Sequence, residues 1–372
     1  MSQRIVHLCY SGTSGSSRTA INIAAGSAEP TRHAYVLYGA RAVRADYGEQ
    51  LDALGCEWRY VRKPGGLLSR AYRGVAPEIL RLEPACVIFH GSRSLPLLWR
   101  LRLKSPALAT VAVQHGPSRE ITSWWRRQTC VQFSQAADRT VTVSDGMAEL
   151  ISRYRTLADA CRPLTVIPNG IDVDYWRGEP PAPPASGPVR LAMVATLDAR
   201  KGHNVLLRTV AQLRSAGRNV ACDLLGDGPQ MGKLQVLAGK LGIADIVQFR
   251  GDTDRHGVRD ALRRAHIVCH AALTESFGLA VLEAMAAARP VVATATVGAA
   301  EIVEHERTGL LVQPGDPDAM AAAVARLMDD AQLCRDMALA GRQVARDRYS
   351  HRRMAAAYED VADKVLGGRA NA

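Results

Sequence analysis

Aromatic residues are scarce in this sequence. They make up 5% of the 372 residues, and four of them are phenylalanine. Proteins that bind single-stranded nucleic acid stack the bases on aromatic side chains, and other nucleic-acid-binding proteins carry a recognisable module. The sequence contains no such module, so its composition argues against nucleic acid as a partner.

Long hydrophobic runs are missing as well, although 47% of the residues are hydrophobic. No stretch of 18 or more apolar residues is present that could span a membrane. The first residues, MSQRIVHLCYSGTSG, do not resemble a signal peptide, because the apolar stretch is too short and has the pattern of a strand. We therefore expect a cytoplasmic protein with large buried cores.

The eight cysteines form no pattern that indicates a metal site or a disulfide framework. They are evenly spread, with no C-x-x-C pair and no Cys/His cluster at zinc spacing. Most of them lie in apolar runs such as CVIFH and IVCHAA. This placement predicts buried, reduced thiols.

Acidic residues are under-represented in the first half of the chain. The formal net charge is +11, and residues 1–167 hold 22 basic against 12 acidic side chains, whereas residues 168–372 hold 25 against 24. Nearly all of the excess positive charge therefore belongs to the first half. It points to an anionic partner there: a membrane surface, an acidic acceptor or nucleic acid.

Short apolar runs alternate with helical patterns along the whole chain, which predicts β-α-β units and parallel sheets that are buried on both faces. Two such series are separated by residues 178–188, GEPPAPPASGP, in which five of eleven residues are proline. This composition predicts a stiff, extended and exposed linker. The fold class is thus α/β, with two Rossmann-like domains in tandem.

The stretch ESFGLAVLEAMAAARPVVAT, residues 275–294, carries two carboxylates in apolar surroundings. The preceding run HIVCHAA is predicted to be a buried strand, and FGLAVLEAMAAA a helix that begins near Phe277 or Gly278. Glu275 then lies at the carboxyl end of a parallel strand, where ligands bind in open α/β sheets. Gly278 lets a ligand approach the backbone, and the free N–H groups of the first helical turn favour a phosphate.

Glu283 lies about a turn and a half into that helix, between Leu282 and Ala284. A carboxylate in this position could accept hydrogen bonds from a ribose. In the alternative, Glu275 merely caps the helix and Glu283 is a partly exposed helix residue. The physical chemistry of the residues alone leaves both interpretations open.

The two glutamates also stand in a pattern with a known counterpart. Glu275, seven residues and Glu283 resemble the E-x7-E signature of retaining glycosyltransferases with the GT-B fold, specifically glycosyltransferase family four. The resemblance covers nearly all of residues 165–365, and in the first half it rests mainly on strand order. The other matching segments are VIPNGIDVDYW (166–176), DARKGHNVLL (198–207), LLGDGP (224–229), VQFRG (247–251), YSHRRMAAAYEDV (349–361), QHG (114–116) and ADRTVTVSD (137–145).

The resemblance implies two Rossmann-like domains that face a central cleft, with a C-terminal helix that crosses back to the first domain. The implied parts are an acceptor-binding domain at 1–167, an interdomain segment with the proline-rich linker at 168–188, a nucleotide-sugar-binding domain at 189–345, and the returning helix at 346–372.

The resemblance also implies a role for each matching residue on the donor side. Glu283 would bind the ribose of a nucleotide sugar, and Glu275 would hold hydroxyls of the transferred sugar. Lys201 would neutralise the diphosphate as it leaves. The amides of three residues would hold that diphosphate: Phe277, Gly278 and Leu279.

Further residues take implied roles around the donor. Arg250 and Gly251 would lie near the base, and His115 near the donor sugar and the acceptor. The loop that contains Gly12 and Gly15 would approach the phosphate from the first domain. His115 could also be a satisfied histidine at a strand end, and His90, His203 and His270 are weaker candidates for function than His115.

One departure from the family concerns the diphosphate clamp. The family usually has Gly-Arg-Leu where this chain has Ala195, Thr196 and Leu197, so the clamp arginine is missing. Arg200, beside Lys201, is the expected replacement. The first-domain loop also departs, because its usual Gly-Gly pair is split into Gly12 and Gly15.

The implied activity is the transfer of a sugar from a nucleotide-diphosphate donor to an acceptor, with retention of the anomeric configuration. Fixed positive charge and helix amides stabilise the leaving diphosphate, so neither a metal nor another cofactor is expected. A nucleotide-sugar epimerase of similar fold is the alternative enzyme, and the E-x7-E spacing argues against it. The sequence specifies neither the donor nor the acceptor.

Residues 91–127 combine seven basic residues with a single acid and three of the five tryptophans. Arginine with tryptophan is typical of a surface that binds at the interface of an anionic membrane. We therefore expect peripheral binding to the inner face of the cytoplasmic membrane and a lipid-linked or anionic acceptor. The residues are Arg93, Trp99, Arg100, Arg102, Lys104, Arg119, Glu120, Trp124, Trp125, Arg126 and Arg127.

Overall fold

The computed structural model divides the chain into two compact units. The first unit comprises Met1–Asp172 and Ser350–Ala372, and the second comprises Val173–Tyr349. The structure describes residues 3–12, 14–40, 42–63, 74–116, 124–153, 164–182, 184 and 186–370. Cys161, Arg119 and Glu120 lie outside these ranges.

The first unit is built on a seven-stranded sheet with the strand order β3-β2-β1-β4-β5-β6-β7. All pairings between neighbouring strands are parallel. The strands are β1 (Ile5–Tyr10), β2 (His33–Gly39), β3 (Trp58–Arg62), β4 (Cys86–His90), β5 (Ala109–Gln114), β6 (Arg139–Thr142) and β7 (Leu164–Val166).

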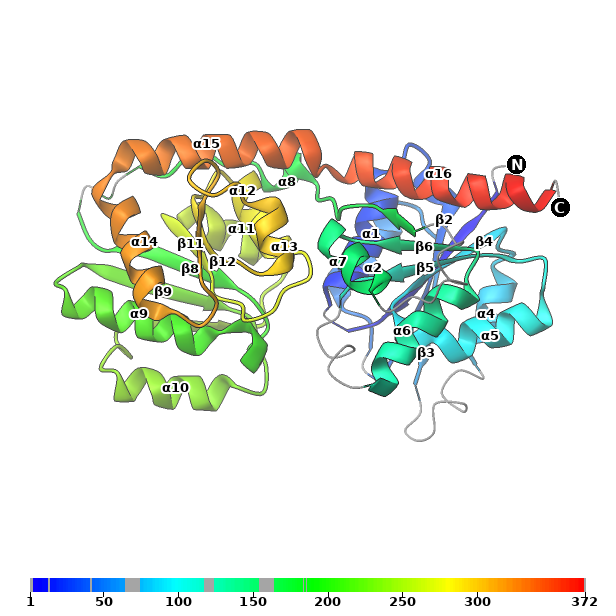
Figure 1. Cartoon of the computed structure of the whole chain (residues 1–372), viewed down its shortest axis with the longest axis horizontal. Helices are drawn as coiled ribbons and strands as arrows, with labels where there is room; N and C mark the ends of the chain where they lie inside the picture. The colour runs from blue at the N-terminus through cyan, green and yellow to red at the C-terminus, as the bar shows by residue number, and fades with distance from the viewer. Residues whose placement is uncertain are drawn as a thin grey trace. The chain divides into compact units, whose positions relative to one another are not determined.

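Helices cover both faces of this sheet, because its central strands are apolar on both sides. Alternate residues of β1 and β2 pack against α1 and α2, and the residues between them pack against α4, α5 and α6. Helix α16 lies beside α1 and also contacts β5 (Figure 1). The elements are α1 (Gly15–Gly26), η1 (Pro30–Arg32), α2 (Ala45–Ala53), α4 (Val75–Arg81), η2 (Ser92–Ser94), α5 (Leu95–Lys104), α6 (Trp124–Ala136), α7 (Asp145–Ser152) and α16 (His351–Ala370).

The C-terminal residues are tied to the first unit by close backbone contacts. Ile171 and Ser350 form a parallel bridge, and Cβ atoms at Gly26 and Gly170 would overlap with the backbone of Ser350 and His351. Only glycine allows the chain to pass this closely.

The second unit holds a six-stranded sheet with the order β10-β9-β8-β11-β12-β13, again with parallel neighbours. The strands are β8 (Val189–Val194), β9 (Val220–Leu225), β10 (Val247–Gly251), β11 (Ile267–His270), β12 (Val291–Thr294) and β13 (Leu310–Val312).

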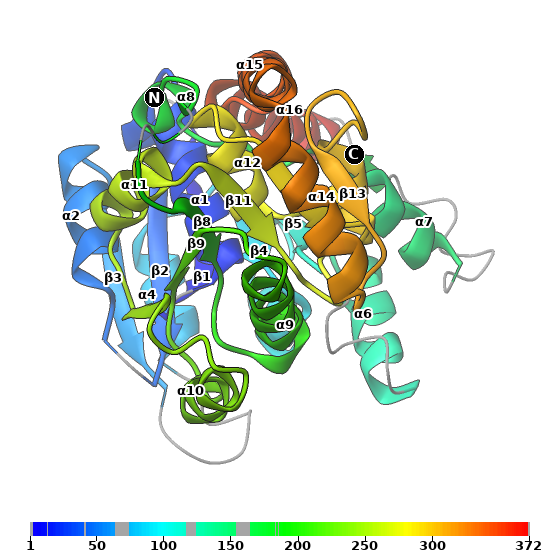
Figure 2. The same ribbon diagram turned by 90° about the vertical axis from the view of Figure 1, so that its left-hand side faces the viewer.

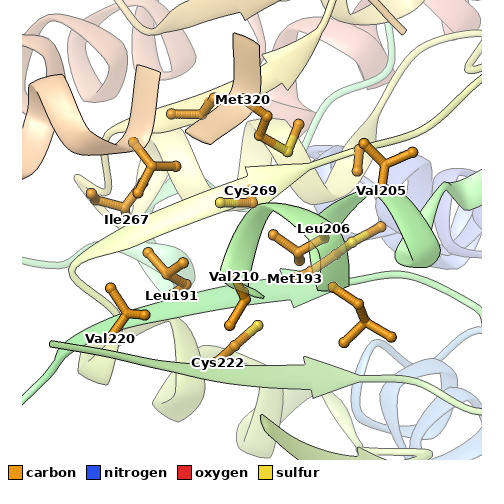
Figure 3. Packing of buried hydrophobic residues seen from close by; sticks show 14 of the residues in the cluster. Leu191, Met193, Val205, Leu206, Val210, Val220, Cys222, Ile267, Cys269 and Met320 are labelled. Carbon is orange, nitrogen blue, oxygen red and sulfur yellow. The ribbon is translucent and has the colours of Figure 1, made fainter. Parts of the chain in front are cut away.

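Helices α9 and α14 pack together over one face of this sheet (Figure 2). Side chains from these helices and from β8, β9 and β11 interlock in a hydrophobic core of the unit (Figure 3). The elements are α8 (Val173–Trp176), η3 (Ala199–Lys201), α9 (His203–Ser215), α10 (Met231–Lys240), α11 (Arg255–Arg264), α12 (Leu279–Ala286), α13 (Val297–Ile302), α14 (Pro317–Asp329) and α15 (Ala331–Arg348).

The proline-rich stretch, residues 178–188, is expected to form a stiff, extended and exposed linker. The unit boundary falls between Asp172 and Val173, so residues 178–188 belong to the second unit. There the carbonyl of Gly178 accepts a hydrogen bond from Arg342, and the carbonyl of Glu179 accepts one from Arg289. The described residues of the stretch form no helix or strand, because proline cannot donate to a ladder, and the two arginines hold its start.

Within the described ranges, no helix is both long and apolar enough to cross a membrane. The described cysteines are free, and six of the seven are buried. Burial raises the pKa of the Cys86 and Cys269 thiols to about 12. These thiols are therefore structural rather than reactive.

Candidate active site

The second unit places two of the expected site residues at its topological switch point. The strand order reverses between β8 and β11, which are neighbours in the sheet although they are far apart in sequence. Lys201 ends η3, just after β8, and Glu275 follows β11. Both therefore lie at the carboxyl edge of the sheet, where open α/β sheets bind their ligands.

Lys201 and Glu275 form an ion pair there. The Nζ atom of Lys201 donates to Oε2 of Glu275 at 2.5 Å, and both side chains are mostly buried. The backbone N–H of Ser276 donates to Oε1 at 3.2 Å, and Nε2 of His270 lies 3.5 Å from Oε2. The second of these contacts is too long for a good hydrogen bond.

The surroundings of Glu275 favour its ionised form. Burial alone would raise the pKa of this carboxyl, but the contact with His270 and the positive charge of Lys201 outweigh burial and hold the pKa below its ordinary value. A fixed anion and a fixed cation thus stand side by side in a site with little water. This arrangement can orient sugar hydroxyls and stabilise a developing phosphate charge at neighbouring points.

Helix α12 begins directly after this pair. Gly278 is its N-cap in the left-handed conformation, with φ 107°, and the helix starts at Leu279, one or two residues later than expected. The carbonyl of Glu275 accepts a hydrogen bond from the N–H of Gly298, the second residue of α13. A Cβ atom at Gly298 would overlap with the backbone of Phe277, so α13 fixes the loop that carries Glu275.

Glu283 is buried on α12, with 8% of its surface exposed. The alternative in which it is a partly exposed helix residue is therefore wrong. Burial of a carboxylate is costly unless hydrogen bonds or opposite charge compensate it. A buried glutamate is therefore typical of a residue with a specific role.

Arg250 and Gly251 end strand β10, at the same edge of the sheet. The Nε atom of Arg250 donates to Asp223 at 2.9 Å, and Arg190 donates to the other oxygen of this carboxylate at 3.0 Å. The sequence interpretation missed Asp223. A charged residue inside the apolar strand VACDLL was the signal that could have revealed it.

Arg200, the expected replacement for the clamp arginine, lies in η3 beside Lys201. Its guanidinium donates to Asp198 at 3.0 Å, and its backbone N–H donates to the same carboxylate oxygen. Asp198 therefore caps η3 and also fixes the direction of Arg200. Thr196 lies two residues before Asp198.

The remaining expected residues belong to the first unit. Gly12 and Gly15 follow β1, and Ser14 between them caps α1 by accepting a hydrogen bond from the N–H of Ser17 at 3.1 Å. His115 follows β5, and its Nε2 lies 2.8 Å from Nδ1 of His90. Strands β1, β4 and β5 are adjacent, with the switch point of this sheet between β1 and β4. In each sheet, the expected residues thus gather at the carboxyl edge.

The fold and these two edges define a class of protein. Two α/β units, each with a parallel sheet, are the architecture of GT-B glycosyltransferases. In the second unit, the ion pair of Lys201 and Glu275 precedes the N-terminus of a helix. Family models agree: one described as "Glycosyltransferase Family 4" matches residues 13–175, and one described as "Glycosyl transferases group 1" matches residues 179–344. The chain belongs to glycosyltransferase family 4 and is a glycosyltransferase.

Curated relatives point the same way. The chain is 30% identical over 351 residues to a GDP-mannose-dependent alpha-(1-6)-phosphatidylinositol monomannoside mannosyltransferase of Mycolicibacterium smegmatis, with 88% of each chain covered. It is 34% identical over 236 residues to a D-inositol 3-phosphate glycosyltransferase of Streptomyces avermitilis, which covers 58% of this chain and 49% of that protein.

Solved structures share the fold. HepE of Anabaena, in complex with UDP and glucose, superposes with a TM-score of 0.83 at 20% identity, over 97% of this chain and 100% of that one. The apo form of the lipopolysaccharide outer core galactosyltransferase WaaB superposes with a TM-score of 0.71 at 15% identity, over 97% and 100%.

Proposed function

We propose that this glycosyltransferase moves a sugar from a nucleotide-diphosphate donor to an anionic, lipid-borne acceptor, with retention of the anomeric configuration. The observation that carries the proposal is the buried pair of Lys201 and Glu275 at the switch point, directly before the N-terminus of α12. The acceptor class rests on the relatives, which by name act on phosphatidylinositol monomannoside or on D-inositol 3-phosphate.

In this proposal, each half of the pair serves one part of the donor. The N–H groups of the first turn of α12 and the ammonium of Lys201 face the diphosphate, whose charge grows as the anomeric bond breaks. The carboxylate of Glu275 accepts hydrogen bonds from the hydroxyls of the transferred sugar. Glu283, further along α12, accepts from the ribose, and Arg250 with Gly251 lies at the base.

Exposed apolar side chains support a membrane-borne acceptor. On α5, Trp99 is 47% exposed and Leu103 85% exposed, and Trp124 at the start of α6 is 59% exposed. Helices α5 and α6 pack against each other. Large apolar groups beside exposed cations such as Lys104 are suited to the interface of an anionic bilayer.

Not every cation of this segment is available to lipid. Arg102 forms an ion pair with Asp138 at 3.0 Å, and Arg369 binds the same carboxylate. Arg102 is therefore a structural residue of the first unit. The side chains of Trp125 and Arg126 lie outside the described residues.

Thermal unfolding with a panel of nucleotides and nucleotide sugars tests the donor. A donor at about 100 times its Kd should stabilise the folded protein by roughly 2.7 kcal/mol. GDP-mannose is the first candidate and UDP-sugars the second. In a Glu283→Ala variant, we expect the same donor to bind more weakly, because the ribose loses its acceptor. If no nucleotide diphosphate or nucleotide sugar stabilises the parent protein, the proposal is wrong.

A further inference from the structure

Five polar side chains of the first unit form a continuous chain of hydrogen bonds across its sheet. The chain starts at Glu359 on α16, passes through three buried histidines and ends at His115 after β5. We call these five groups the histidine relay. Its links are Glu359 Oε1 to His33 Nε2 at 3.0 Å, His33 Nδ1 to His7 Nε2 at 2.9 Å, His7 Nδ1 to His90 Nε2 at 3.1 Å, and His90 Nδ1 to His115 Nε2 at 2.8 Å.

The strand order and register produce this alignment. The histidines come from β2, β1, β4 and the end of β5, which are consecutive neighbours in the sheet. Each step to the next strand also advances two residues toward its carboxyl end. Because side chains alternate faces along a strand, an advance of two keeps every histidine on the same face. The register pairs that show it are Ile5 with His33, His7 with Ile88, and His90 with Val113.

The relay is insulated from water for most of its length. His7 and His33 are fully buried and His90 nearly so. Tyr35 stacks on His7 with 4.9 Å between ring centroids, and its hydroxyl donates to the carbonyl of Ala20 on α1. Helices α1 and α16, which pack side by side, carry the groups that contact this layer (Figure 1).

Burial keeps His7 and His90 neutral. It lowers the pKa of both rings well below the ordinary histidine value, and the adjacent histidines lower it further. Burial also lowers the pKa of His115, to about 3. A neutral imidazole carries one N–H and one lone pair. His7 and His90 therefore each donate on one side and accept on the other.

The carboxylate of Glu359 determines which ring nitrogen of His33 carries the proton. The hydrogen bond from His33 holds the pKa of this carboxyl below its ordinary value. The hydroxyl of Ser27 also donates to Oε1 at 2.5 Å. An ionised carboxylate only accepts, so Nε2 of His33 must carry the proton. A neutral His33 then accepts at Nδ1 from Nε2 of His7, and in the same way His7 accepts from His90 and His90 accepts from Nε2 of His115.

We propose that Glu359, acting through His33, His7 and His90, holds His115 in the tautomer with the proton on Nε2 and the lone pair on Nδ1, and that the relay carries protons between Nδ1 of His115 and Glu359. Glu359 and the three inner histidines are positioning residues, and the inference rests on the proposed function only in giving His115 a role in transfer.

The proton steps balance without any other reactant. A proton taken up at Nδ1 of His115 is matched by loss of the Nε2 proton to His90 Nδ1. His90 passes its Nε2 proton to His7, His7 passes its own to His33, and His33 protonates the carboxylate of Glu359. One proton enters and one is stored as carboxylic acid on Glu359, and the same steps in reverse return it to Nδ1 of His115 and restore the starting tautomers.

The tautomers can be measured directly. In protein labelled with ¹⁵N-histidine, the two ring nitrogens of a neutral imidazole resonate in separate regions according to which one carries the proton. Single substitutions of His33 and His115 assign the signals. We expect all four histidines in the Nε2–H form at neutral pH. A His115 with its proton on Nδ1 in the parent protein would overturn the proposal.

Two variants on one helix separate the relay from general effects of charge. Glu359→Gln removes the negative charge at the end of the relay. It keeps the shape of the side chain and an oxygen that can accept from His33 and Ser27. Asp363→Asn removes a carboxylate one turn further along α16, which pairs with Arg32 rather than with a histidine. We expect a measurable Nδ1–H population at His115 in Glu359→Gln and the parent pattern in Asp363→Asn. An unchanged His115 in Glu359→Gln would overturn the relay.

An activity measurement then tests the link to transfer. We expect Glu359→Gln to lower kcat on the order of tenfold with little change in the donor KM, since one acid/base contribution is impaired. Asp363→Asn should leave both constants unchanged. Parent-like kcat in Glu359→Gln would overturn the role in transfer. The expected tautomers in a protein without transferase activity would instead count against the proposed function alone.

Discussion

At the scale of single residues, the ion pair of Lys201 and Glu275 serves both stability and the proposed chemistry. Lys201→Met leaves a largely buried carboxylate without its cation, so we expect a loss on the order of 2 kcal/mol in the free energy of unfolding. The double variant Lys201→Met, Glu275→Gln should lose less free energy of unfolding than Lys201→Met alone, because it leaves no unpaired buried charge. Urea unfolding measures both. A double variant that is less stable than the single one would contradict the pairing.

The same pair predicts a pH dependence. The pKa of Glu275 is held below its ordinary value, so the carboxylate stabilises the folded state above the unfolded pKa of about 4.3. That contribution is lost as pH falls toward the folded-state pKa. The stability difference between the parent and Glu275→Gln should therefore be largest at neutral pH and shrink below about pH 4.

Arg200 gives a second test at this scale. If it helps Lys201 to neutralise the leaving diphosphate, Arg200→Ala should raise the barrier to transfer by about 2.7–4 kcal/mol. Thr196→Arg should be tolerated and should restore part of the loss in the Arg200→Ala background. Steady-state kinetics with the donor measures the turnover of the parent and of these variants. Parent-like turnover in Arg200→Ala would show that another group completes the clamp.

At the scale of elements, the contact between α13 and the loop before α12 positions the site. Gly298→Ala places a methyl group against the backbone of Phe277, and overpacking of this kind costs roughly 1–3 kcal/mol. Gly232→Ala on α10 is the matched control, because a Cβ there meets nothing within 4 Å. It should be neutral or stabilise by about 0.4–1 kcal/mol. Equal melting temperatures for the two variants would contradict this role of α13.

Local patterns were sufficient to predict some elements and not others. The strand, loop and helix around Glu275 were predictable because they follow one another in sequence, and only the helix start was off. The neighbours Lys201 and Glu275 were predictable through a family resemblance, not through spacing. The relay was not predictable: Glu359 and its bonded partner His33 are 326 residues apart, and only the order β2-β1-β4-β5 aligns the histidines.

The proline-rich stretch shows a different limit. Its composition predicts an extended, exposed linker. Composition does not reveal that Arg289 and Arg342, more than a hundred residues later, hold its first carbonyls and so assign it to the second unit. Such long-range hydrogen bonds depend on the finished fold.

At the scale of the whole molecule, the excess positive charge of the first half and its exposed apolar side chains predict reversible binding to anionic membranes. Each cation near the surface contributes about 1 kcal/mol. We expect the protein to sediment with anionic vesicles at low salt and to be released as salt rises. Trp99→Ala with Leu103→Ala should weaken binding by at least about tenfold, given the apolar area removed.

Val236→Ala is the control for that experiment. Val236 is 60% exposed on α10 of the second unit, so its loss should leave vesicle binding unchanged. A variant with Trp124→Ala and Arg127→Glu should bind more weakly than the parent. If the parent protein stays in the supernatant with anionic vesicles at low salt, the acceptor is a soluble molecule instead.

The measurement that most directly tests the central claim is proton NMR of the reaction itself. The parent protein is incubated with the nucleotide sugar that stabilises it and with phosphatidylinositol-containing vesicles, and the anomeric signals are followed. The account predicts loss of the donor, release of the nucleoside diphosphate, and a new glycosidic signal with the donor's anomeric configuration, all lost in Glu275→Gln. A product of inverted configuration, or a donor that is epimerised without transfer, would contradict it.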